Sequence, residues 1–309
     1  MNRSLILGTR GSALALAQTQ IVRALIHRAF PALSVEIKII KTSGDKKIRV
    51  PLAQSGIKGL FTKELEQALI RKQIDLAIHS LKDLPTDLPA GLMLAAVTER
   101  EDPADVLVCH PLTQKENPKL IYTSSPRRAI QAKLLWPNCE IKDIRGNVET
   151  RVHKLSEGSS GDALLLAAAG LKRLDFLRGE TSKGNLHGEP SFSYRKLSIL
   201  EMIPAPGQAA IGIETRSDDG ETQERLKSIN HSPSFGAVTA ERAFLDAVGG
   251  GCSAPIAAHA VAGFDGLRLI AMVAQDPKHI WRGEKSGSRR DAENLGKGLA
   301  EEYHQTKKT

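Results

Sequence analysis

The stretch Asp75-Leu-Ala-Ile-His-Ser-Leu-Lys-Asp-Leu-Pro85 points to the fold. Apolar residues recur at every second position, a spacing that predicts a short strand, namely at Ile74, Leu76 and Ile78. A proline then ends regular structure. Lys82 and Asp83 are thus placed at the carboxyl end of a strand, where ligands bind in open α/β sheets. An ordinary turn with a solvated Lys-Asp pair has the same pattern, so the rest of the chain has to decide.

Length and composition predict a multidomain protein without a membrane span. The 309 residues exceed one ordinary domain, so two or three are expected. Hydrophobic residues make up 41% and charged residues 25%, enough for packed cores. Apolar runs stay shorter than a membrane helix needs. Arg10 interrupts the N-terminal apolar run before a signal peptide can form, and we expect a cytoplasmic protein.

Cysteine spacing and net charge narrow the class of ligand. Cys109, Cys139 and Cys252 are widely separated and form no metal-binding pattern, so we expect no metal. The net charge of +8 is compatible with nucleic-acid binding, but aromatic residues make up only 4% of the chain. The basic residues also stand singly at predicted loops. This pattern favours a small polyanionic ligand over a nucleic acid.

Strands and helices alternate in the first hundred residues. Residues 5–10 predict a buried strand, and Ser12 then caps a helix over 13–29. An alternating strand over 35–40 and a helix over 63–72 follow. Such alternation is typical of a doubly wound α/β lobe.

A second lobe of the same kind begins after the charged segment 99–104, which we interpret as a hinge. Strands are predicted at 120–123, 140–145 and 162–168. Between the first two, Ser125 is placed to cap a helix whose first residue is Pro126. The free N–H groups at that helix start form a favourable anion site.

Basic residues repeatedly follow the predicted strands of both lobes. Each alone is most simply a solvated surface base, but the arrangement occurs six times, at Arg10, Lys82, Arg127, Arg128, Arg145 and Arg151. Guanidinium groups bind two oxygens of a carboxylate or phosphate at once. If the two lobes face each other across a cleft lined with these Arg and Lys side chains, the cleft would bind a ligand rich in carboxylates or phosphates.

The last part of the chain predicts a smaller α+β unit. Residues 178–200 are polar and glycine-containing and predict an irregular excursion, after which 204–214 returns to an apolar strand. A helix over 237–248, a hairpin around 265–266 and a helix over 292–303 then follow. We expect domain 1 to span 1–98 and 208–227, domain 2 to span 104–203, and domain 3 to span 232–309.

Three glycines precede Cys252 and leave its thiol sterically open. One interpretation is a glycine-rich helix end followed by a small buried cysteine, which is the commoner situation. The other is a nucleophilic or attachment thiol on an adjustable loop. The motif alone favours the first.

These motifs, in this order and spacing, resemble the porphobilinogen deaminase (hydroxymethylbilane synthase) family over nearly the whole chain. They are Gly8–Ser12, Lys58–Glu66, His79–Pro85, Glu99–Pro103, Thr123–Arg128, Arg145–Arg151, Ala169–Arg173 and Gly250–Cys252. The resemblance implies two lobes similar to periplasmic binding proteins and a third α+β domain. It also implies a transferase of porphyrin and haem biosynthesis.

The resemblance further implies a dipyrromethane cofactor held by a thioether at Cys252. Four porphobilinogens would be added head to tail with loss of ammonia, and water would release hydroxymethylbilane. Asp83 matches the family's catalytic aspartate, which stabilises cationic pyrrole and azafulvene species and can serve in proton transfer. Lys82 stands beside it.

The resemblance also implies binding residues for cofactor and substrate. For the cofactor these are Lys82, Asp83, Ser125, Arg127, Arg128 and Arg145. For the substrate they are Arg10, Ser12, Lys58, Phe61, Arg145, Arg151 and Arg173. Those that match residues holding acetate and propionate side chains are Lys82, Arg10, Ser12, Ser125, Arg127, Arg128, Arg145, Arg151 and Arg173. Three positions depart from the common pattern without removing a chemical group: Gln54 for a frequent Lys, Pro126 for another apolar residue, and Ala209 for a frequent Gly. The last is expected to crowd the crossing between lobes.

Two other classes stay open on the sequence. A two-lobed anion-binding protein without enzymatic activity would share the lobes but carry no covalent chromophore. A nucleic-acid-binding protein would show steep salt dependence with duplex DNA or RNA. For the enzyme, we expect porphobilinogen as the small-molecule partner, no nucleic acid, no membrane, and a monomer.

Overall fold

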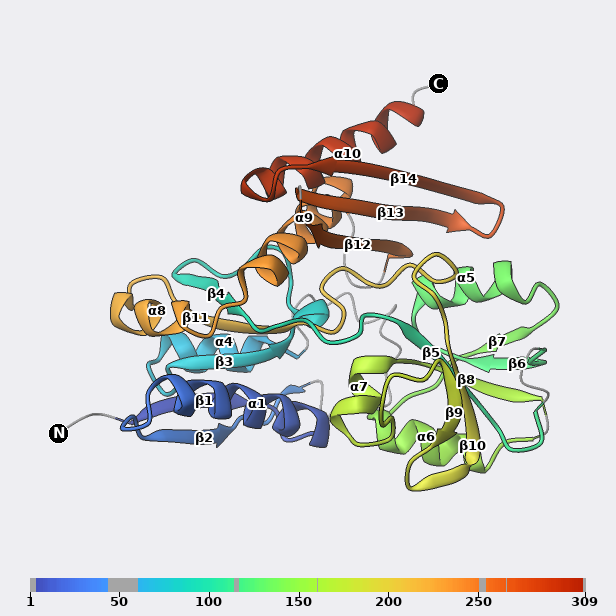
Figure 1. Cartoon of the computed structure of the whole chain (residues 1–309), viewed down its shortest axis with the longest axis horizontal. Helices are drawn as coiled ribbons and strands as arrows, with labels where there is room; N and C mark the ends of the chain where they lie inside the picture. Colours follow the sequence, from blue (N-terminus) through green and yellow to red (C-terminus); the bar gives the residue numbers. More distant parts are fainter. Residues whose placement is uncertain are drawn as a thin grey trace.

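A computed structural model describes residues 4–43, 61–113, 117–159, 161–249, 254–264 and 266–307. Three sheets organise these residues into two lobes that lie side by side and a third unit that lies above both in Figure 1. The α/β class, with two sheet-based lobes and a small C-terminal α+β unit, is confirmed. None of the helices in the described ranges is both long and apolar enough to span a bilayer.

The first lobe is built on a five-stranded sheet in the order β2-β1-β3-β11-β4. Its strands are β1 (Leu5–Thr9), β2 (Val35–Ile39), β3 (Leu76–Ser80), β4 (Leu92–Val97) and β11 (Ile211–Arg216). β1 runs parallel to β2 and β3, whereas β11 is antiparallel to β3 and β4. The chain therefore leaves this sheet after β4 and returns to its interior more than a hundred residues later.

Three helices cover the first sheet. They are α1 (Ala13–Ala29), α4 (Lys63–Ile70) and α8 (Gly220–Lys227). Buried residues of α1 and α8 pack with alternate residues of β1, β3 and β11 on one face, while those of α4 pack on the other. α1 has the predicted bounds, and Ser12 Oγ accepts a hydrogen bond from the Ala15 N–H at 3.3 Å, which confirms it as the cap.

The second lobe has a six-stranded sheet in the order β7-β6-β8-β5-β10-β9. Its strands are β5 (Asp105–Cys109), β6 (Leu120–Tyr122), β7 (Glu140–Lys142), β8 (Asp162–Ala167), β9 (Lys183–Leu186) and β10 (Glu189–Lys196). Its helices are α5 (Pro126–Leu135), α6 (Val148–Ser156) and α7 (Ala168–Arg173). Ser125 caps α5 and Pro126 is its first residue, both as predicted.

The prediction of an irregular excursion over 178–200 is wrong. β9 and β10 form an antiparallel hairpin that extends the second sheet beyond β5. Phe192 and Tyr194 are 2% and 5% exposed and join the core of this lobe, while the intervening residues are polar. Gly188, with φ 78°, makes the turn. Polar and glycine residues concealed this two-residue periodicity because an edge hairpin buries only part of its surface.

The third unit consists of a three-stranded sheet and two helices that pack side by side and run in the same direction. The elements are α9 (Ser232–Val248), β12 (Ile256–Gly263), β13 (Gly266–Asp276), β14 (His279–Gly287) and α10 (Ala292–Thr306). The predicted hairpin around 265–266 joins β12 to β13 and is confirmed. α9 begins five residues before the predicted start, because His231 caps it and Pro233 occupies its first turn. β14 was not predicted, since its residues are mostly polar and partly exposed.

Candidate active site

Asp83 ends a short 3₁₀ turn, η1 (Leu81–Asp83), which follows β3 directly. Leu81 and Leu84 are 1% and 2% exposed and fix the turn to the core of the first lobe. The Leu81 N–H also donates to the Ala210 carbonyl at 3.0 Å. Asp83 itself is exposed and Lys82 is half-buried. The two leucines thus hold the backbone while the carboxylate stays open to a ligand, as the strand-end position predicts.

Lys82 lies among cations from the other lobe. Burial, and after it repulsion from Arg128, lowers the pKa of its ammonium to about 8. Asp83 and Asp105 oppose this shift without cancelling it. The Lys82 ammonium is therefore poorly solvated and lies near Arg128, and an anionic ligand would stabilise its charged form.

Arg127 and Arg128, at the start of α5, both reach the carboxylate of Asp105. Arg127 Nη1 lies 2.7 Å from Asp105 Oδ2, and Arg128 Nη2 lies 2.7 Å from Asp105 Oδ1. All three side chains are buried. The two guanidinium groups hold the pKa of Asp105 well below its usual range. One acid thus neutralises part of the charge that the sequence assigned wholly to ligand binding.

Asp105 was not predicted as a site residue from the sequence. Its signal is a single acid at the start of the otherwise apolar strand Asp105–Cys109. Gln208 extends the cluster, because its Nε2 donates to Asp105 Oδ1 at 3.0 Å and to the Pro103 carbonyl at 2.7 Å. Residues 103–104 and 208 belong to the two segments that connect the lobes, and Asp105 begins β5 directly after the first segment. The Asp105 cluster therefore lies at the crossing.

Arg151 connects the second lobe electrostatically to Asp83. Its Nε donates to the Gly146 carbonyl at 2.8 Å. Burial, and after it repulsion from Arg128 and Arg145, lowers the pKa of its guanidinium to about 10, although Asp83 opposes the shift. Asp83 in one lobe and these arginines in the other thus share one electrostatic environment. The fold brings Asp83 near Arg151, which lies 68 positions later in the sequence.

Arg10 and Arg173 lie on either side of this group in the sequence and are held differently. The Arg10 guanidinium lies over the Phe61 ring, 4.2 Å from its centroid. Arg173 Nη2 donates to the Ala209 carbonyl at 2.6 Å. Burial lowers the pKa of Arg173 to about 10 in spite of the nearby Glu101 carboxylate. The hydrogen bond from Arg173 to Ala209 connects the second lobe to the segment that leads back into β11 of the first lobe.

Ala209 adopts a left-handed conformation with φ 73°. This is the position where the sequence departs from a frequent glycine, and a left-handed residue explains why glycine suits it. The effect of the alanine is therefore backbone strain at the crossing. Lys58, Gln54 and Cys252 fall outside the described residues.

The other two cysteines are both buried. Cys109 and Cys139 are each 1% exposed and belong to the core of the second lobe. Neither thiol is accessible for attachment of a cofactor. The helix α9 ends at Gly249, which has φ 78° and lies three residues before Cys252 in the sequence. Within the described ranges, His, Cys, Asp and Glu side chains form no group of three that could hold a metal ion.

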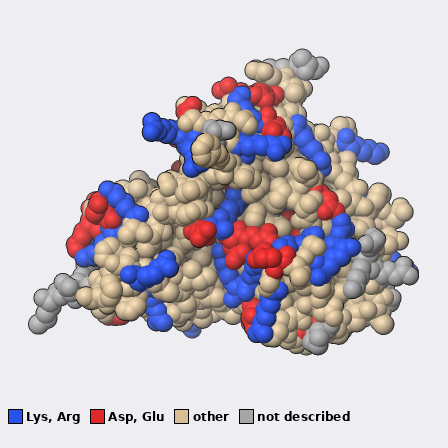
Figure 2. Space-filling view, viewed as in Figure 1, with Lys and Arg blue, Asp and Glu red and all other residues tan. Residues whose placement is uncertain are grey.

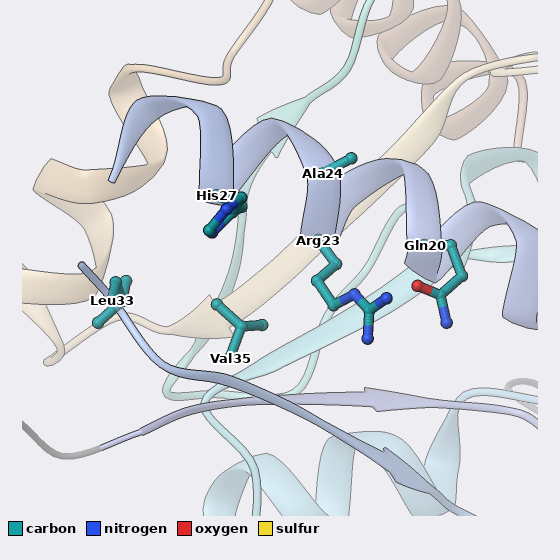
Figure 3. A pocket seen from close by; sticks show the side chains of 6 residues that line it. All are labelled: Gln20, Arg23, Ala24, His27, Leu33 and Val35. Atoms are coloured by element: carbon teal, nitrogen blue, oxygen red, sulfur yellow. The ribbon is translucent and has the colours of Figure 1, made fainter. Parts of the chain in front are cut away.

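The surface has a groove that is separate from the candidate site. Acidic and basic side chains gather where the lobes meet on the face shown in Figure 2. Figure 3 shows an open groove between α1 and the chain leading into β2, lined by Gln20, Arg23, Ala24, His27, Leu33 and Val35. It lies along the C-terminal half of α1, whereas Arg10 and Ser12 precede that helix. The groove therefore shares no residue with the predicted site.

Two family models match the chain. Residues 5–224 match "Porphobilinogen deaminase, dipyromethane cofactor binding domain", and residues 235–305 match "Porphobilinogen deaminase, C-terminal domain". Among solved structures, full-length BenM covers 74% of this chain and 66% of its own with 16% identity. Its TM-score of 0.41 is too low to support an argument.

Curated relatives match over nearly the whole length. The porphobilinogen deaminase of Syntrophobacter fumaroxidans is 43% identical over 97% of this chain and 94% of its own. The porphobilinogen deaminase of Syntrophomonas wolfei is 44% identical over 96% of this chain and 94% of its own. The porphobilinogen deaminase of Trichlorobacter lovleyi is 45% identical over 97% of this chain and 92% of its own. The chain therefore belongs to the porphobilinogen deaminase family.

Proposed function

We propose that the chain performs the reaction of its family, the assembly of four porphobilinogens into hydroxymethylbilane, in the cation-lined space beside Asp83. The observation that carries this proposal is the electrostatic environment shared by Lys82 and Arg151. Burial, and after it repulsion from Arg128, lowers the pKa of both groups, and Asp83 raises both. A substrate whose rings each bear two carboxylates would neutralise such a site.

The residues of the site fit the dipyrromethane cofactor of the family. Its carboxylates require several fixed donors, and guanidinium groups are suited to bind them. Within the described residues, the Arg127 Nε is buried and makes no hydrogen bond, so one donor remains for a ligand after Asp105 is bound. When bound, the cofactor supplies the growing end to which substrate is joined. We propose that it is held by Cys252, Lys82, Asp83, Ser125, Arg127, Arg128 and Arg145.

Asp83 is the catalytic carboxylate in this proposal. It is exposed at the end of a turn whose two leucines are buried, so its position is fixed while its oxygens remain accessible. A carboxylate there accepts hydrogen bonds from pyrrole N–H groups and stabilises positive charge as the substrate amine leaves. It can also carry a proton to that nitrogen. Lys82 binds a carboxylate beside it.

Substrate binding is assigned to residues around this pair. The Arg10 guanidinium and the Phe61 ring are already in contact. The full set is Arg10, Ser12, Lys58, Phe61, Arg145, Arg151 and Arg173. The three domains are proposed to span 1–98 with 208–227, 104–203, and 232–309, a division that the three separate sheets support. We further propose a cytoplasmic monomer that does not bind nucleic acid.

The test begins with the intact mass of the denatured protein, followed by peptide mapping. An added mass of two pyrrole units on the Cys252 peptide is expected. Purified protein is then incubated with porphobilinogen, and tetrapyrrole product is measured by absorbance. If the protein shows neither an adduct nor turnover after this incubation, the proposal is wrong and a non-enzymatic anion-binding protein takes its place.

The attachment site is tested separately by three cysteine variants. Cys252→Ser is expected to lack the covalent cofactor and to lose turnover. Cys109→Ala and Cys139→Ala are matched controls, because both cysteines are buried and alanine preserves a small apolar side chain. Both controls should keep the adduct. An adduct in the Cys252→Ser protein would place the attachment elsewhere.

A further inference from the structure

α9 presents one face to the turn that carries Asp83. Four of its residues, spaced by three or four positions, lie on one side of a helix, and they are Phe235, Val238, Arg242 and Asp246. Val238 is buried in one cluster with Leu81 and Leu84, and Phe235 packs against that cluster. The third unit therefore supports the turn from outside the first lobe.

Arg242 holds the backbone immediately after Asp83. Its Nη1 donates to the Leu84 carbonyl at 2.8 Å, and its Nη2 donates to the Pro85 carbonyl at 2.6 Å. One turn further along α9, Asp246 Oδ1 accepts from Thr86 Oγ1 at 2.9 Å. Three consecutive residues that follow Asp83 are thus bound by one helix from another unit.

A guanidinium group is particularly suited to this contact. Its planar fork can donate to two carbonyls in a fixed geometry, whereas an ammonium group acts as a point charge without that constraint. Hydrogen bonds from a charged donor are about twice as strong as neutral ones. The two bonds therefore restrain both the position and the orientation of the Leu84–Pro85 backbone.

The same helix leads to the cofactor loop. α9 spans 17 residues from Ser232 to Val248 and ends at Gly249, three residues before Cys252. Arg242 therefore connects the loop of the attachment cysteine to the loop of the carboxylate through one continuous helix. Neither contact involves a residue that we assign to substrate or cofactor.

We propose that Arg242 is a positioning residue for Asp83, setting the place of its carboxylate relative to the cofactor held by Cys252. This inference rests on the proposed roles of Asp83 and Cys252. Its two hydrogen bonds to residues 84 and 85 restrain the backbone directly after Asp83. Loss of its two hydrogen bonds shifts the carboxylate while the carboxylate-binding arginines remain in place.

The test uses the Arg242→Gln and Arg242→Lys variants as holoenzymes, with loading checked by intact mass. For Arg242→Gln, kcat is expected to fall by roughly 10- to 100-fold, because a misplacement of about 1 Å can cost that much. KM for porphobilinogen should stay within about twofold of the wild-type value, as expected when binding residues are intact. Arg242→Lys should recover part of the loss. Arg282→Gln, at an exposed position of β14, is the matched control and should leave both constants unchanged.

The outcomes separate this inference from the proposed function. If wild-type protein lacks turnover, the proposed function fails. If wild-type protein is active and Arg242→Gln holoenzyme keeps a normal kcat, or changes only KM, the positioning role is wrong. Should Arg242→Gln fail to fold, Thr86→Val removes the neighbouring contact with Asp246 and should still lower kcat with KM unchanged. A normal kcat in that variant would equally overturn the inference.

Discussion

The Arg127 guanidinium lies 2.7 Å from the Asp105 carboxylate, and both side chains are buried at the crossing between the lobes. Arg128 binds the other oxygen of the same carboxylate. This acid allows two adjacent arginines to be buried at the start of α5, beside the proposed carboxylate-binding site. The pairing of Asp105 with the two arginines therefore affects both the stability of the second lobe and the net charge of the proposed site.

Removing the acid should destabilise the protein strongly. In Asp105→Asn, two buried guanidinium groups lose their counter-ion, and breaking such a buried pair costs about 3–5 kcal/mol. Urea denaturation at pH 7 is expected to show this decrease in the free energy of unfolding. Asp218→Asn, at an exposed loop position, is the control and should change it little.

The same contact predicts an acid dependence. The folded-state pKa of Asp105 is depressed, so its contribution to stability is present above the ordinary Asp pKa near 3.9 and is lost as pH falls below it. The stability difference between wild type and Asp105→Asn should therefore narrow below about pH 4. A difference that stays constant down to pH 2 would contradict the assignment.

Asp83→Asn separates chemistry from binding. The amide keeps the size of the side chain but loses the negative charge that stabilises the reacting cation. We expect folded protein with bound pyrroles and a fall in kcat of roughly 100-fold or more. Asp87→Asn, four residues later at an exposed position, is the matched control. Turnover near the wild-type rate in Asp83→Asn would remove Asp83 from the chemistry.

Lys82 predicts an alkaline limit on substrate binding. The pKa of its ammonium is lowered to about 8, so the fraction that carries a charge falls as pH rises through this value. KM for porphobilinogen should therefore increase above about pH 8. In Lys82→Arg, the guanidinium stays charged, and this rise should be absent from the pH profile. If both proteins show the same rise, another group is responsible.

Ala209→Gly should relieve strain at the crossing. A left-handed alanine costs about 1–2 kcal/mol, while glycine adds an entropic cost of about 0.5–1 kcal/mol. The free energy of unfolding is expected to rise by about 0.5–1 kcal/mol, measured by urea denaturation. Ala210, the next buried residue, does not have a positive φ. Ala210→Gly therefore relieves no strain and should lower the free energy of unfolding. A decrease in Ala209→Gly would show that the alanine methyl contributes more than its strain costs.

Local features of the fold could be predicted from the sequence. Caps and periodicity act within a few residues, so Ser12 and α1, Ser125 and α5, and the hairpin between β12 and β13 were predicted correctly. The β9–β10 hairpin was missed because its alternation is short and its flanks are polar. β14 was missed for a similar reason, since one of its faces remains largely exposed.

The sequence by itself determined that Asp83 stands at the end of a strand, that bases follow many other strands, and that Cys252 follows three glycines. Only the tertiary structure decided which of those bases meet an acid. Asp105 contacts residues more than twenty positions away, and Arg242 contacts Leu84 across 158 positions. Contacts over such distances leave no periodic pattern in the chain, because they depend on how separately folded units pack against one another.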